Sequence, residues 1–292
     1  MKKLVYVLLL SIAGQLQAAE LIQLDRFVWR DSQENFGGFS GIEVNSDGSE
    51  FTAISDKGRI VSGKFIRRDG HIDRIESGSL VALQTRKGQP VGRFNIDSEG
   101  LAIDDAGHIH VSFESNHRVW RYDTIGTRAQ ELGTHPDFRH FQDNSGMEAL
   151  AIDPGGVLYT LPERSGALNR PFPVYRYKNG AWEQPFSIPR TGVFLPVGAD
   201  FSPDGKFYLL ERDFVWYSGF STRIRRFDLT QAGFVNEEVL LTTGFGTHDN
   251  LEGLATWSNS AGQICLTMVS DDNFKFLQVT EFVEYCLAEV SE

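Results

Sequence analysis

Acidic side chains recur at two fixed places in a motif that appears five times along the chain. Each copy has a first residue, a short apolar segment, a turn, and a second apolar segment that ends in a carboxylate. Three of the five copies have an acid at the first place, Glu99, Glu148 and Glu252, while the other two have Ser40 and Val197 there. All five copies have an acid at the second place: Asp56, Glu114, Glu163, Glu211 and Asp271.

These acids are expected to gather at one edge of the fold. In an antiparallel hairpin the first residue of one strand lies beside the last residue of the next, so both acids of a copy share one end. The loops just before the first strands add Asp97, Asp143 and Asp249. Crowded carboxylates repel one another unless they are protonated, paired with a base or bound to a hard cation.

Ligands that offer only oxygen favour Ca²⁺ or Mg²⁺ over Zn²⁺. The sequence therefore predicts that the acids of both places form a site for one of these cations. The alternative is that each acid accepts hydrogen bonds from backbone N–H groups where a strand meets a loop, and so holds the repeat together.

Basic residues accompany four of the second-place acids: Lys57, Arg118, Arg164 and Arg212. Guanidinium groups bind phosphate and carboxylate with two parallel hydrogen bonds, which makes Arg164 and Arg212 candidates for holding an anionic substrate. The alternative is a set of local ion pairs, which contribute little to stability when they are exposed.

One histidine stands close in sequence to the acids. His248 is followed by Asp249 and Asn250 and leads into Glu252. An imidazole that changes its charge near neutral pH is suited to proton transfer, so His248 is the candidate catalytic base. The alternative is a solvated loop residue.

The spacing of the motif predicts the fold. The copies begin at Phe39, Ser98, Met147, Pro196 and Asn250. A repeat of about 50 residues with paired short strands is typical of four-stranded β-propeller blades. We therefore expect an all-β propeller of five blades, or of six if a degenerate blade lies between Arg59 and Asn95.

The last copy has only three apolar strands before the chain ends. A further strand, from Leu21 to Arg30, precedes the first copy and belongs to none. Pairing of this strand with the last blade would close the ring and cover an exposed edge. The sequence also predicts a helical turn around His135 to Phe141.

The chain has two cysteines, Cys265 and Cys286, placed symmetrically about the turn between the last two strands. Facing positions on neighbouring strands are close enough for a disulfide. We expect the two to be bridged; the alternative is a pair of buried free thiols.

Residues 1–19 have the pattern of a secretory signal peptide: Lys2 and Lys3, an apolar run from Leu4, and small residues at Ala18 and Ala19. We expect residues 20–292 to form one domain of a periplasmic or secreted protein. No later apolar run approaches the ~20 residues of a membrane span. The formal net charge of −11 argues against nucleic acid as a partner.

Several catalytic motifs are absent from the sequence. There is no G-x-S-x-G, H-E-x-x-H, C-x-x-C or G-x-x-x-x-G-K-[ST] stretch. Serine-nucleophile, zinc-protease and P-loop chemistry are therefore disfavoured.

The motifs, in their order, resemble those of the phytase-like family, described as having an esterase-like activity of phytase. The stretches that carry the resemblance are FSGIE from Phe39, ISDKG from Ile54, SEGLAID from Ser98, EALAID from Glu148, LPERSG from Leu161, LLERD from Leu209 and NLEGLA from Asn250. The resemblance implies a propeller, export, and hydrolysis of phosphate esters with Ca²⁺. The chain lacks the D-D-P-A-[I/V]-W stretch of propeller phytases, so phytate does not follow as its substrate.

Two classes of function remain. The first is a hydrolase that depends on Ca²⁺ or Mg²⁺ and acts on a small anionic substrate or an ester, most plausibly a phosphate ester. The second is a non-catalytic propeller that binds a ligand or a protein at the same face. A lactonase-like hydrolase is a variant of the first class, since propellers of that kind also hold a central cation with carboxylates.

Overall fold

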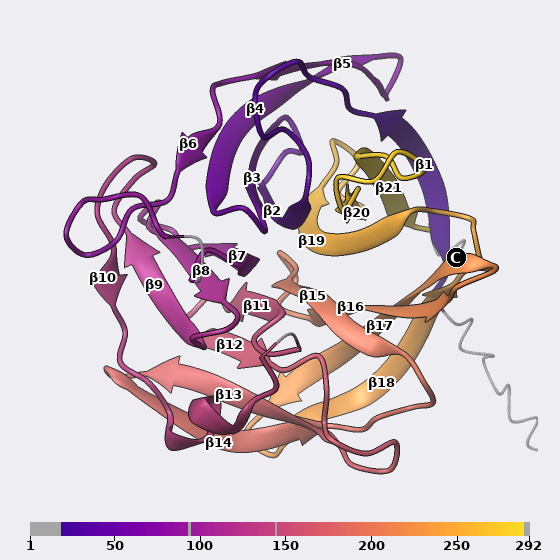
Figure 1. The fold of residues 1–292 in the computed structure, drawn as a ribbon. Helices are drawn as coiled ribbons and strands as arrows, with labels where there is room; N and C mark the ends of the chain where they lie inside the picture. The colour runs from indigo at the N-terminus through magenta and orange to yellow at the C-terminus, as the bar shows by residue number, and fades with distance from the viewer. Residues whose placement is uncertain (1–18, 93–94, 144, 289–292) are drawn as a thin grey trace, which may run out of the picture.

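A computed structural model describes residues 19–92, 95–143 and 145–288, in which five β-sheets form a ring (Figure 1). Each sheet is one blade. Its strands are antiparallel and lie side by side from the centre of the ring to the outside. Blade 1 consists of β2 (Phe39–Val44), β3 (Glu50–Ser55), β4 (Arg59–Arg68) and β5 (His71–Ser77), with β6 (Val81–Ala82) paired to β4. Blade 2 consists of β7 (Ser98–Ile103), β8 (Ile109–Phe113), β9 (Arg118–Tyr122) and β10 (Gln130–Glu131).

The other three blades repeat this order. Blade 3 consists of β11 (Ala149–Ile152), β12 (Leu158–Leu161), β13 (Phe172–Lys178) and β14 (Ala181–Ile188). Blade 4 consists of β15 (Leu195–Phe201), β16 (Phe207–Val215), β17 (Gly219–Thr230) and β18 (Gly233–Thr242). Blade 5 consists of β19 (Asn250–Ser258), β20 (Ile264–Asp271), β21 (Glu281–Leu287) and β1 (Leu21–Val28).

The five-blade prediction is confirmed, and the six-blade alternative is wrong. The segment from Arg59 onward forms β4, β5 and β6, which all pair within blade 1. These strands complete the outer part of the first blade because β2 and β3 supply only its inner half. The predicted helical turn is also present, as a short 3₁₀ helix over Pro136–His140.

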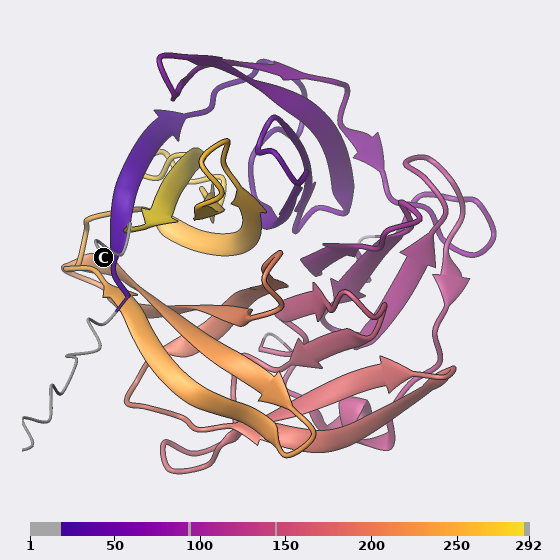
Figure 2. The same cartoon turned by 180° about the vertical axis from the view of Figure 1, so that it is seen from behind.

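The N-terminal strand closes the ring, as predicted. β1 pairs antiparallel with β21, from Leu21 opposite Leu287 to Val28 opposite Glu281. The two strands lie side by side at the outer edge of blade 5 in both views (Figures 1 and 2). The pairing gives the backbone groups of β21 a partner on the edge that faces away from β20.

The disulfide prediction is confirmed. Cys265 on β20 lies directly opposite Cys286 on β21, with their Cα atoms 4.0 Å apart, and the two form a disulfide. Both residues are buried in the apolar cluster between blades 5 and 1.

Glycines let the inner strands approach one another closely. A Cβ atom on Gly100 of β7 would lie 2.8 Å from the backbone oxygen of Glu148, which directly precedes β11, and one on Gly198 of β15 would collide with the backbone oxygen of Glu252 on β19. The space on the axis between the inner strands is about 10 Å³. Glu99, which directly precedes Gly100, and Glu252, whose backbone faces Gly198, are therefore crowded around a narrow centre.

Apolar side chains fill the spaces between blades. In the described residues, one buried hydrophobic cluster lies at each of the five contacts between neighbouring blades. Packing between blades therefore fixes their positions around the axis, and with them the ends of the inner strands. None of the described helices has the length and apolarity to cross a membrane.

Candidate functional site

Strand register brings the acids to one end of the ring, which we call the acidic mouth. The backbone N–H of Glu114 donates to the carbonyl of Asp97 at 2.9 Å, and that of Asp56 donates to the carbonyl of Gly38 at 2.8 Å. In blade 5, Asp271 lies opposite Asn250. The end of each second strand thus lies beside the start of its inner strand, as the hairpin geometry requires.

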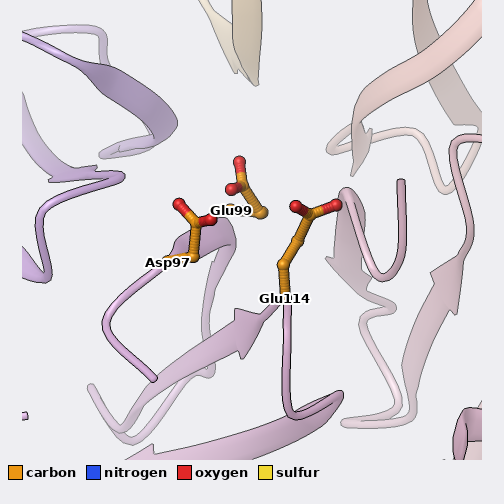
Figure 3. Close-up of side chains that lie close together, drawn as sticks. All are labelled: Asp97, Glu99 and Glu114. Carbon is orange, nitrogen blue, oxygen red and sulfur yellow. The ribbon is translucent and has the colours of Figure 1, made fainter. Parts of the chain in front are cut away.

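Three acids of blade 2 form the tightest group. Asp97, Glu99 and Glu114, which we call the blade 2 triad, each place a carboxylate oxygen within 4.8 Å of the others. Figure 3 shows their carboxylates directed into the same space beyond the ends of β7 and β8. The backbone N–H of Gly146 donates to Oε1 of Glu114 at 2.7 Å and holds that side chain in place. The triad therefore offers several oxygen ligands from fixed positions.

Two further glutamates on inner strands are buried near the triad. Burial raises the pKa of Glu99 well above its usual value, and Glu114 and Glu252 raise it further. Burial also raises the pKa of Glu148, and the charge of Glu99 raises it further. These three first-place acids, Glu99, Glu148 and Glu252, therefore lie close enough to repel one another when ionised.

The mouth continues across blades 5 and 1. Burial, followed by the charge of Glu252, raises the pKa of Asp271 to about 8. Burial raises the pKa of Asp56 as well, although Nζ of Lys57 lies 2.6 Å from its Oδ2. A cation bound among these carboxyl groups would favour their ionised forms.

A single arginine enters the other side of the mouth. Arg212 follows Glu211 on β16 of blade 4, the blade that has Val197 in place of a first-place acid. Its guanidinium pairs with Glu252, and its Nη2 lies 3.3 Å from Oε1 of Glu163. Arg212 therefore supplies the internal counter-charge for this side, from a blade that lacks a first-place carboxylate.

Asn250 supports this side and was not singled out from the sequence. Its buried side-chain amide donates to Oε1 of Glu252 at 2.8 Å, and its carbonyl oxygen accepts a hydrogen bond from Arg212. An amide at the start of an inner strand gives no charge signal, and only its contacts reveal the role. The acidic mouth thus has two halves: the blade 2 triad, and an ion-paired half with Arg212, Glu252 and Glu163.

Glu211 occupies a second-place position but lies apart from this arrangement. Its side chain is fully buried, with Oε2 2.7 Å from Nε of Arg223 and Oε1 2.7 Å from Nη2 of Arg225. The same two arginines donate to the carbonyls of Thr191 and Pro189. Glu211 is therefore neutralised within the fold, and we leave it out of the candidate cation site.

His248 is also placed away from the carboxylates. Its Nε2 lies 2.8 Å from the hydroxyl of Tyr285, and burial lowers its pKa to about 4. Among the described hydrogen bonds and ion pairs, none joins His248 to an acid of the mouth. Burial favours the neutral imidazole, which packs against Tyr285 of blade 5. The proposed role as a base is left without a described contact to support it.

The basic residues predicted to accompany the acids behave differently from one another. Nε of Arg164 lies 3.3 Å from Oε2 of Glu163, and its side chain is half exposed. Arg118 instead stacks on Phe113 and Trp120, with its guanidinium carbon 4.0 and 4.2 Å from the two ring centres. Arg164 and Arg212 are thus the two arginines on either side of Glu163, whereas Arg118 belongs to packing within blade 2.

Another buried acid pair at the opposite end of the ring was not predicted. Both oxygens of Asp200 are hydrogen-bonded: Oδ1 by the N–H of Phe201 and Oδ2 by the N–H and hydroxyl of Thr256. Oε1 of Glu43 accepts from the N–H of Ile103 at 3.3 Å. Glu43 thus links blade 1 to blade 2, and Asp200 links blade 4 to blade 5. This is the structural role that the sequence analysis gave as the alternative to a cation site.

Known structures with the same fold are distant in sequence. An exo-β-1,3-galactanase from Clostridium thermocellum matches with a TM-score of 0.59 and 11% identity, over 93% of this chain and 63% of that one. α-L-Arabinofuranosidases from Coprinopsis cinerea and Podospora anserina match with TM-scores of 0.56 and 0.54, each at 10% identity over 93% of this chain and 98% of theirs. At such identities the matches show the fold alone.

No curated protein matches the chain at a significant level. A family model does match, over residues 34–274, which spans all five inner strands and both halves of the acidic mouth. Its description is "Phytase-like: Esterase-like activity of phytase". The chain belongs to the phytase-like family.

Proposed function

We propose that this protein is a hydrolase that depends on a divalent cation and acts on phosphate esters or other esters at the acidic mouth. The observation that carries the proposal is the blade 2 triad, three carboxylates with oxygens within 4.8 Å of one another. Membership of the phytase-like family supports the hydrolase class.

The donor set fits a hard cation. Asp97, Glu99 and Glu114 offer only oxygen ligands. Glu148 and Glu252 lie close enough to Glu99 to make the site more negative when they are ionised. Such ligands suit Ca²⁺ or Mg²⁺. A bound cation of this kind supplies charge that polarises an ester oxygen and lowers the pKa of a coordinated water.

The ion-paired half of the mouth suits the anionic part of a substrate. Arg212 is 22% exposed and Arg164 is 50% exposed. Both guanidinium groups reach toward Glu163, so both have donors at the border between the mouth and solvent. In the proposed role they orient the phosphoryl or carboxyl oxygens of the ester and stabilise the charge that develops on them.

Metal analysis and activity assays test this proposal together. The purified protein is assayed on phosphate esters, carboxyl esters and lactones, with and without chelator. We expect turnover that chelation abolishes and that Ca²⁺ or Mg²⁺ restores. The triple change of Glu99, Glu148 and Glu252 to Gln should abolish turnover while the protein stays folded, whereas the exposed control Glu183→Gln should behave as the native protein. Turnover that persists in chelator, or in the triple variant, contradicts the proposal.

A non-catalytic binding propeller is the second candidate. The observation that favours it is the position of His248, which contacts Tyr285 and no acid of the mouth among the described residues. In that case the mouth binds a cation or ligand and no substrate of the panel is turned over. A lactonase-like activity is tested by the lactone arm of the same assay.

We also propose that the protein is exported to the periplasm or secreted. The signal-peptide pattern of residues 1–19 supports this, although residues 1–18 lie outside the described part of the chain. The disulfide between Cys265 and Cys286 supports it as well, because cytosolic thiols are kept reduced. N-terminal sequencing of the protein recovered from a periplasmic extract or culture medium tests it; a mature protein that begins at Met1 contradicts it.

A further inference from the structure

A second cavity lies directly beside the acidic mouth. It has a volume of about 470 Å³ and is formed by the loop after β12, the 3₁₀ helix and the outer strands of blade 3. Its lining includes Arg164, Arg170, His140, Ser165 and Gln184. We call it the blade 3 pocket. Glu163 separates it from the mouth: Oε2 lies 3.3 Å from Arg164 on the pocket side, and Oε1 lies 3.3 Å from Arg212 on the mouth side.

In the loop after β12, the side chain of Arg170 packs closely against Gly166. Gly166 has a φ of +90°, and a Cβ atom there would lie 3.1 Å from Nη1 of Arg170. The N–H of Arg170 donates to the carbonyl of Ala167 at 3.1 Å and closes the turn. A residue other than glycine at this position would be strained and would push the guanidinium away. The loop geometry therefore brings Arg170 to the pocket.

The pocket has more arginines than carboxylates that pair with them, since among the described residues only Arg164 pairs with an acid, Glu163. Nη1 of Arg190 donates to Oγ of Ser165 at 3.2 Å, behind the lining. Burial lowers the pKa of Arg190, and repulsion by Arg164 adds to this. Within the described part of the chain, neither Arg170 nor Arg190 forms an ion pair. An anion bound in the pocket would supply the arginines there with a negative partner.

The acid on the pocket lining, Asp137, already has partners other than the arginines. Oδ2 of Asp137 accepts a hydrogen bond from the hydroxyl of Tyr175 at 3.0 Å, and His135 lies 3.6 Å from it. The side-chain amide of Gln184 has two N–H groups, of which one donates to the carbonyl of Phe186, so the other is a further donor on the lining. Guanidinium groups with neutral donors beside them form the usual surroundings of a bound phosphate or carboxylate.

We infer that the blade 3 pocket binds a second anionic group of the substrate, a phosphate or a carboxylate, while the ester group lies at the acidic mouth. The inference rests on the proposed function and narrows its substrate class to esters that carry at least one further anionic group. Since a single carboxylate, Glu163, separates the two sites, one small molecule can span them. Arg164, which lines the pocket and pairs with Glu163, is placed to contact both parts of it.

Anion binding in the presence of chelator tests the pocket separately from hydrolysis. Inorganic phosphate and, in a parallel arm, acetate are titrated by calorimetry into the native protein, Arg170→Gln, Arg170→Lys and the control Lys178→Gln. Lys178 is exposed on the same blade, at the far end of β13, so its loss removes the same charge elsewhere. We expect Arg170→Gln to weaken binding of the preferred anion about tenfold or more, because hydrogen bonds between charged groups contribute at least that much. Arg170→Lys should lose less, and Lys178→Gln nothing.

The outcomes separate the pocket from the hydrolase. Weakened anion binding in Arg170→Gln supports the pocket even if no ester is turned over, and tighter binding of phosphate or of acetate identifies the second group. If turnover is found, Arg170→Gln should raise KM for an ester with a second anionic group and leave KM for one without it unchanged. The inference is overturned if the native protein binds neither anion at millimolar concentration, or if Arg170→Gln binds both as tightly as Lys178→Gln does. Unchanged melting of Arg170→Gln excludes misfolding as the cause of a loss.

Discussion

Glu114 and Glu211 occupy equivalent positions in two blades, yet their surroundings are opposite. Glu114 directly follows β8 and belongs to the blade 2 triad, near Asp97 and Glu99. The N–H of Gly146 donates to its Oε1, and its side chain is also hydrogen-bonded to the acid Glu148. Glu211, on β16, is fully buried between Arg223 and Arg225 and accepts three hydrogen bonds from them. In the described residues, the same repeat position thus holds an acid without a basic partner in blade 2 and an acid paired with two arginines in blade 4.

The difference shows that position in the repeat fixes where an acid lies, while its neighbours fix what it does. The arginines that pair with Glu211 come from β17 of its own blade. In blade 4 the residue two before Glu211, Leu209, faces Arg225 of β17. In blade 2 the residue two before Glu114, Ser112, faces the uncharged Val119 of β9. Arg118 faces Phe113 and stacks on its ring. A structural acid and a candidate ligand are therefore distinguished by the third strand of the blade.

The largest expected effect is on stability at Glu211. Glu211→Gln leaves two buried guanidinium groups without their shared carboxylate, which should lower the free energy of unfolding by about 3–5 kcal/mol. Glu114→Gln should lower it far less, or raise it, because it relieves repulsion within the triad. Urea unfolding of both variants in chelator measures this. Equal losses in the two variants contradict the distinction between paired and unpaired acids.

An intermediate effect is expected at Arg212. Arg212→Gln removes the counter-charge of Glu252 and Glu163, and we expect a loss of about 2 kcal/mol, less than for a fully buried pair because the side chain is partly exposed. Ca²⁺ should stabilise the variant more than it stabilises the native protein, because the mouth is more negative without Arg212. Thermal unfolding with and without Ca²⁺ measures both; a variant whose stability Ca²⁺ does not affect contradicts the prediction.

A smaller effect is expected from pH. The pKa of Asp271 is raised from 3.8 to about 8, first by burial and then by Glu252. Between pH 4 and 8 Asp271 is protonated to a greater extent in the folded protein without metal than in the unfolded chain, so its contribution to the free energy of unfolding should fall as pH rises. Asp271→Asn should remove that fall. Unfolding measured in chelator across this range tests it, and identical slopes for the native protein and the variant contradict it.

The fold was predictable because it depends on local periodic signals. The five copies, the closing strand from Leu21 and the pairing of Cys265 with Cys286 all follow from strand spacing and hairpin symmetry. The outer part of blade 1 was harder to assign because β4, β5 and β6 follow β3 without a motif of their own. The structure assigns them by pairing, which sequence spacing alone does not specify.

The site was predictable only in part, for a physical reason. Hairpin register places the acids at one end of the ring, and this required no knowledge of side-chain contacts. Which acid is paired depends on side chains from other strands, as with Arg225 at Glu211 and Tyr285 at His248. Asn250 and the Gly166 turn under Arg170 carry no charge pattern, so only their contacts identify them.

Calcium binding by the Glu114 and Glu211 variants tests the central claim most directly. Calorimetric titration of Ca²⁺ is performed on the native protein, Glu114→Gln and Glu211→Gln, each at a temperature where it is folded. The account predicts that the native protein binds Ca²⁺, that Glu114→Gln loses about tenfold or more of the affinity by losing a charged ligand, and that Glu211→Gln binds as the native protein does. If the native protein binds no Ca²⁺, or if Glu114→Gln binds as tightly as Glu211→Gln, the acids of the mouth are structural and the proposed cation site is wrong.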